Sequence, residues 1–82
     1  MQKNKIGTST SIEKITQTAN DHYGEGEITF VGLKYQYKEG WIAKIKRENG
    51  PSITGHSLSS SGKALKRLHK RLNKIIDRYN MI

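Results

Sequence analysis

The stretch from Ser59 to Ile82 constrains the fold most, because its residue pattern predicts one helix with two opposed faces. Apolar residues recur every three or four positions along one side, at Leu65, Leu68, Leu72, Ile75, Tyr79 and Ile82. Basic residues fill the rest of the circumference, at Lys63, Lys66, Arg67, Lys70, Arg71, Lys74 and Arg78. The apolar side must therefore pack against another element, while the basic side offers positive charge to a partner.

The length of the chain limits it to one small domain. A chain of 82 residues buries about 60–65% of the surface that its unfolded form exposes, so the core is thin. We predict a flexible N-terminal tail over residues 1–9 and a single α+β domain over residues 10–82. The sequence lacks cysteine, which excludes disulfides and fits a cytoplasmic location. Apolar runs reach only two or three residues, so we expect no contact with a membrane.

A first helix is expected from about Ser11 to His22. Thr10 and Glu13 have the spacing of a capping box, and Ile12, Ile15 and Ala19 share one helical face. Two strands follow, over residues 27–38 and 41–47, where apolar and polar residues alternate. The alternation changes phase within the first strand, which predicts a β-bulge near Gly32.

Two pairings of these strands are possible. A three-residue loop over residues 38–40, with Gly40 at positive φ, would place Tyr37 opposite Trp41 and Leu33 opposite Ile45. A two-residue turn would place Trp41 opposite Lys38 instead. The first pairing is favoured because it puts the apolar side chains of both strands on one face.

A third strand over residues 52–58 is expected at an edge of the sheet, after the turn at residues 48–51. Its register is not determined by the sequence. The predicted order is α-β-β-β-α: a three-stranded antiparallel meander packed on the long basic C-terminal helix, with the first helix beside it. Its predicted core is Leu33, Tyr35, Trp41, Ala43, Ile45, Leu65, Leu68, Leu72, Ile75 and Ile76.

Positive charge is expected on two surfaces. Residues 61–82 hold seven basic residues and one acidic residue, which is +6 of the net charge of +8. The face of the sheet away from the helix would carry a second group, at Lys34, Gln36, Lys38, Ile42, Lys44 and Lys46. The two surfaces would lie on opposite sides of the core, where one flat ligand could not easily use both. The alternative is that both are solvated surfaces that keep the protein soluble and unaggregated.

Catalytic and metal-binding patterns are missing from the sequence. The three histidines stand apart, the acidic residues are scattered, and Ser59–Ser61 is best placed to cap the last helix. We therefore expect no enzyme, no metal and no cofactor. Tyr35, Tyr37 and Trp41 could stack on bases from an open sheet, but their phase favours a place in the core.

With these elements placed, two families resemble the chain. The α-β-β-β-α order and the segment from Gly55 to Arg67 resemble double-stranded-RNA-binding domains, which implies phosphate contacts from Lys63, Lys66, Arg67 and Lys70. The segment from Tyr35 to Leu72 resembles the arm-type DNA-binding domains of integrases from mobile elements. That resemblance implies DNA reading by the sheet residues Lys34, Gln36, Lys44 and Lys46. Antitoxins of the HicB type have a similar outline.

Together these observations predict a small non-enzymatic DNA- or RNA-binding protein of phage or mobile-element origin, monomeric or homodimeric. The residues expected to contact the nucleic acid are Lys34, Gln36, Lys44, Lys46, Lys63, Lys66, Arg67, Lys70, Arg71 and Lys74. The alternative function is that of a protein-binding inhibitor, antitoxin or host-takeover factor that engages an acidic partner protein.

Overall fold

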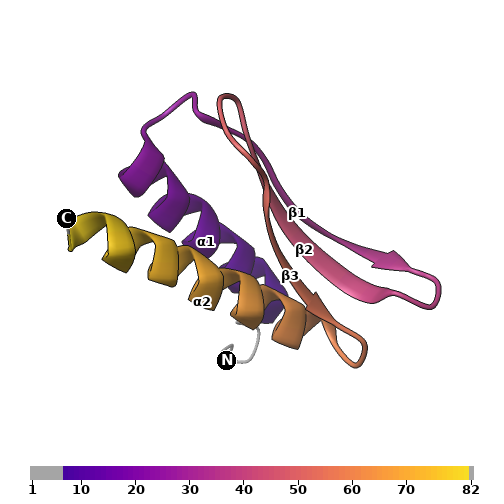
Figure 1. The fold of residues 1–82 in the computed structure, drawn as a ribbon. Helices are drawn as coiled ribbons and strands as arrows, with labels where there is room; N and C mark the ends of the chain where they lie inside the picture. The colour runs from indigo at the N-terminus through magenta and orange to yellow at the C-terminus, as the bar shows by residue number, and fades with distance from the viewer. Residues whose placement is uncertain (1–6, 82) are drawn as a thin grey trace, which may run out of the picture.

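The order of elements confirms the predicted α+β arrangement. The computed structural model describes residues 7–81, with side chains from Ile12 onward. Its elements are α1 (Gly7–Tyr23), β1 (Ile28–Gln36), β2 (Gly40–Arg47), β3 (Ile53–Ser57) and α2 (Ser61–Asn80). Both helices lie on the same face of the sheet (Figure 1). Of the predicted tail, residues 1–6 lie outside the described residues, and residues 7–9 belong to α1.

The strands form an antiparallel sheet in the order β1-β2-β3. The loop of the first hairpin has three residues, as predicted, but the register is two residues away from the expected one. Leu33 lies opposite Ala43, and Tyr35 lies opposite Trp41. Gly40, at the expected positive φ of 86°, is inside the ladder opposite Gln36, because its backbone packs against the backbone of Ser57. The shift is even, so the apolar residues of β1 and β2 still share one face.

The β-bulge lies earlier in β1 than predicted. Ile28 is opposite Arg47 and Phe30 is opposite Lys46, so the extra residue is Thr29, and the ladder is regular through Gly32. The bulge turns Ile28 toward the core, where it joins Val31 on the helix side. As a consequence, Phe30 lies on the opposite face of the sheet.

The core lies between the sheet and the two helices. Nine apolar side chains are buried there: Ile15, Ala19, Ala43, Ile45, Ile53, Ala64, Leu65, Leu68 and Leu72. Four other predicted core residues, Leu33, Trp41, Ile75 and Ile76, pack around them and are partly buried. The prediction for Tyr35 was wrong, because this residue lies at the hairpin end of an edge strand and is 58% exposed.

Helix α2 packs closely on the edge strand β3. The backbone of α2 packs directly on β3 at Gly55, where an added Cβ would lie 2.5 Å from the carbonyl oxygen of Ala64.

The predicted capping of α2 is confirmed: Ser60 Oγ accepts a hydrogen bond of 3.1 Å from the backbone N–H of Lys63. The predicted capping box of α1 was wrong, because the helix already begins at Gly7 and Thr10 lies inside it.

Candidate nucleic-acid interface

One face of the sheet is not covered by either helix (Figure 1). We call it the open face. Strand alternation and the observed register place nine residues there: Phe30, Gly32, Lys34, Gln36, Ile42, Lys44, Lys46, Thr54 and His56. The four sheet residues predicted to contact nucleic acid, Lys34, Gln36, Lys44 and Lys46, are all among them. Lys38 was also expected on this face, but it lies in the hairpin loop with a φ of 70°.

The open face is positively charged and contains no acidic residue. Lys44 lies on the central strand between Gly32 and Thr54, its partners in β1 and β3. The side chain of His56 is held by a hydrogen bond between its Nε2 atom and the backbone carbonyl of Glu39. The basic side chains of the open face, Lys34, Lys44 and Lys46, lie on paired strands and not on loops.

Two arginines of α2 reach the outer edge of β3. Arg67 Nη1 donates a hydrogen bond of 2.8 Å to the carbonyl oxygen of His56, and Arg71 Nη1 donates one of 3.4 Å to that of Thr54. These carbonyls belong to alternate residues of the strand, and on an edge strand they would otherwise face solvent. The arginines thus connect the helix to the sheet and bring positive charge to the sheet edge.

A groove of about 710 Å³ lies between β3 and α2, and we call it the helix groove. Its strand wall consists of Thr54, Gly55 and His56, and Ile75 supplies an apolar patch. Five basic residues line its helix wall: Arg67, Lys70, Arg71, Lys74 and Arg78. Four of the six helix residues predicted to contact nucleic acid are therefore brought together here.

The open face and the helix groove meet at β3. Thr54 and His56 belong to both surfaces, and Thr54 is the direct partner of Lys44 in the sheet. The sequence predicts that the basic residues of the sheet and of the helix lie on opposite sides of the core, where one flat ligand could not easily use both. In the structure they are linked around the edge of the sheet, because Arg67 and Arg71 extend over it.

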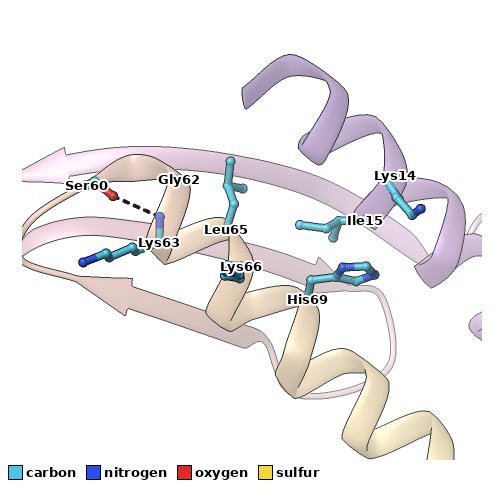
Figure 2. Close-up of a pocket in the computed structure, with 8 residues that line it drawn as sticks. All are labelled: Lys14, Ile15, Ser60, Gly62, Lys63, Leu65, Lys66 and His69. Carbon is cyan, nitrogen blue, oxygen red and sulfur yellow. Dashed lines mark hydrogen bonds between the residues drawn. The ribbon is translucent and has the colours of Figure 1, made fainter. Parts of the chain in front are cut away.

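Lys63 and Lys66 lie elsewhere. They line a separate hollow of about 460 Å³ between the start of α2 and α1, together with Lys14, Ile15 and His69. Figure 2 shows the His69 ring of α2 extending toward α1, where Lys14 and Ile15 lie. The helix residues of the predicted site therefore line two different hollows, Lys63 and Lys66 the one beside α1 and the other four the helix groove.

The charges of the described side chains are largely uncompensated. Within residues 12–81 one ion pair is formed, between Arg47 Nη2 and Glu27 Oε2 at 3.6 Å, and it includes none of the ten predicted contact residues. Three acidic residues, Glu13, Asp21 and Glu25, line a hollow along α1 instead. Three of the seven acidic residues thus lie beside α1 and not on the open face.

The chemistry that this surface can perform is the binding of anions by ammonium and guanidinium groups. Among residues 12–81, no cluster of three or more His, Asp or Glu side chains could hold a metal ion. The described helices include none that is long and apolar enough to cross a membrane.

Arg78, Phe30 and His56 are among the residues of these surfaces that were not predicted as contacts. Arg78 continues the row of Lys70 and Lys74 along α2, and this spacing could have identified it. Phe30 shares the phase of Lys34 in the sequence, so its place on the open face could also have been predicted. His56 could not, because the register of β3 is not encoded in any local pattern.

Comparisons of the chain with models of protein families, with curated proteins and with solved structures gave no match.

Proposed function

We propose that the protein binds nucleic acid, without catalysis, through the open face and the helix groove. The observation that carries this proposal is the continuity of the two basic surfaces around β3. A chain of phosphates that crosses the open face past Lys44 would reach Lys70 and Lys74 without leaving positively charged surface. Binding would release the counterions of the neutralised phosphates, so the affinity would fall steeply with salt.

The arrangement of the charges supports this function over that of a merely solvated surface. Surface lysines that only maintain solubility are usually interspersed with acids, which limits the field of one sign. Here the open face contains no acid, and Asp77 is the one acidic residue of α2. A one-sided field of this kind attracts polyanions and accelerates their association.

The first test is a titration of labelled duplex DNA, duplex RNA and single strands at about 50 and 200 mM salt. We expect binding at the lower salt. The plot of log affinity against log salt concentration should become shallower by about 0.7–0.9 for each phosphate contact that a variant loses. Failure to bind any of these nucleic acids at the lower salt would refute the proposal.

The second test asks which surface is used. The pairs Lys44→Glu with Lys46→Glu, and Lys70→Glu with Lys74→Glu, reverse two charges on the open face and in the helix groove respectively. We expect each pair to weaken binding at least about tenfold, because each removes two phosphate contacts. The pair Lys14→Glu with Lys38→Glu changes the net charge equally, away from both surfaces, and is the matched control. Equal, small losses for all three pairs would indicate a solvated surface.

An acidic partner protein is a second candidate, and the helix groove favours it specifically. There, Ile75 provides an apolar patch beside five basic residues, a combination that suits an acidic segment with an apolar anchor. Pull-down from lysate with and without nuclease separates the two functions. A protein that is retained after nuclease treatment, and is lost from the Lys70→Glu and Lys74→Glu variant, would support this candidate.

A further inference from the structure

We infer that the open face around Phe30 is a platform on which a base of a single-stranded nucleic acid stacks, while neighbouring lysines hold its phosphates. This inference rests on the proposed function and specifies the strandedness of the ligand. A single strand can present the face of an unstacked base, whereas the bases of a duplex are already stacked on each other.

Phe30 lies on the open face with its ring against its own strand. The bulge at Thr29 directs this side chain away from the core, and the outer edge of its ring covers the space that a side chain at Gly32 would occupy. The ring is therefore supported by the backbone of its own strand. It is still 50% exposed, which leaves apolar surface available to a ligand.

Lysines of the open face surround Phe30. Lys46 lies directly opposite Phe30 in the ladder, and Lys44 lies opposite Gly32. With Lys34 and Ile42 they line a shallow hollow of about 260 Å³ on the open face. An aromatic ring flanked by ammonium groups is the combination that sequence-tolerant single-strand binders use, with the ring for the base and the cations for the backbone.

Charge also decides between possible occupants of this face. A second copy of the chain would bring Lys34, Lys44 and Lys46 against the same three residues, so like charges oppose a face-to-face dimer. An apolar partner would cover Phe30 and Ile42 but leave the ammonium groups without counter-charge. A polyanion with flat apolar groups can both stack on the Phe30 ring and neutralise the ammonium groups of the lysines.

The experiment compares three ligands of about 12 nucleotides by fluorescence anisotropy: a single strand with bases, an abasic strand with the same phosphates, and a duplex. DNA and RNA versions of the single strand are both measured, and polyglutamate of matched charge is the acidic-polypeptide probe. We expect the strand with bases to bind about 5- to 150-fold tighter than the abasic strand, the range that one stacked base supplies.

Substitutions locate the effect. Phe30→Leu should remove the preference for bases while leaving abasic binding unchanged, because the lysines remain. The matched control is Tyr37→Leu, which removes an aromatic residue that is 80% exposed outside the open face. Lys44→Gln with Lys46→Gln should weaken the strand with bases and the abasic strand alike.

A direct measurement does not depend on any variant. Phe30 is the only phenylalanine in the sequence, so specific isotope labelling of phenylalanine yields the NMR signals of this one ring. Stacking should shift these signals for the strand with bases and not for the abasic strand. Equal binding of the two strands, preference for the duplex, equal binding of polyglutamate, or an unchanged ring signal would overturn the inference. Absence of binding to every nucleic acid would refute the proposed function itself.

Discussion

At the scale of single residues, Gly55 sets how closely α2 approaches the sheet. A Cβ at this position would overlap the backbone of Leu68 and lie 2.5 Å from the carbonyl oxygen of Ala64. We predict that Gly55→Ala lowers the free energy of unfolding by about 1–3 kcal/mol, because the helix must move outward from a packed core. Urea denaturation measures this change.

Gly62 provides the control for that substitution. It lies in the first turn of the same helix, and an added Cβ would have nothing within 4 Å. Gly62→Ala should therefore be neutral or stabilise the protein by up to about 1 kcal/mol, through helix propensity alone. Equal losses for the two substitutions would contradict the close packing of α2 on β3.

Glu27 connects the loop after α1 to the end of β2 and the turn that follows it. Its carboxylate accepts hydrogen bonds from the backbone N–H and the Nδ2 group of Asn49, at 3.0 and 3.2 Å. It also pairs with Arg47, whose guanidinium lies 4.1 Å from the centre of the Tyr23 ring. We predict that Glu27→Ala costs about 1–3 kcal/mol of stability, because it leaves the half-buried guanidinium without its counter-charge.

The control for Glu27 is Glu25→Ala, which removes an equal charge from an exposed position two residues earlier. Thermal unfolding of both variants at the same protein concentration makes the comparison. If the two melt at the same temperature, the Glu27 cluster contributes nothing beyond its surface charge.

At the scale of elements, the sequence predicted the helices and strands well, because each has a clear periodicity. The stripe from Leu65 to Leu72 could only be a buried helical face, and Trp41, Ala43 and Ile45 could only be one face of a strand. The register of the first hairpin could not be derived in the same way. Gly40 belongs to the ladder because it packs on Ser57, a contact between residues far apart in the sequence.

The edge of β3 carries a prediction at this scale. Arg67 and Arg71 donate hydrogen bonds to the carbonyl oxygens of His56 and Thr54. These bonds would hinder another strand from pairing with the edge of β3. We predict that the double substitution Arg67→Ala and Arg71→Ala increases self-association. Sedimentation over a range of protein concentrations would detect it.

The matched control for the edge is Lys70→Ala with Lys74→Ala. It removes the same charge from the same helix groove, but no hydrogen bond from these side chains to β3 is present among the described residues. Self-association of both variants to the same extent would mean that loss of net charge, rather than a freed strand edge, is responsible.

At the scale of the whole molecule, the candidate site was only partly predictable. The basic residues themselves are evident from composition and spacing, and periodicity predicts that they form one group on α2 and another on the sheet. The connection between the two surfaces could not be predicted, because it depends on the register of β3 and on the hydrogen bonds of Arg67 and Arg71 to its edge. Similarly, helical spacing alone does not reveal that Lys63 and Lys66 line a hollow shared with α1 instead of the helix groove.

The size of the molecule limits the ligand that one copy can contact. Its principal extents are 36, 35 and 24 Å, so a strand that runs from the open face around β3 into the helix groove cannot gain contacts indefinitely. We predict that the affinity for single strands rises with length and levels off within about 4–16 nucleotides, the range of other small single-strand binders. A graded series of oligonucleotides at constant salt measures this length.

The same series shows whether one strand uses both surfaces. In the Lys70→Glu and Lys74→Glu variant the positively charged surface ends at β3. The affinity should therefore level off at a shorter oligonucleotide length than in the unmodified protein. If only the open face binds, the two proteins should level off at the same length, and the reversed charges should weaken binding solely through the long-range field. That field is screened over about 8–10 Å near physiological salt, so its contribution should fade as salt increases, while the difference in length should persist.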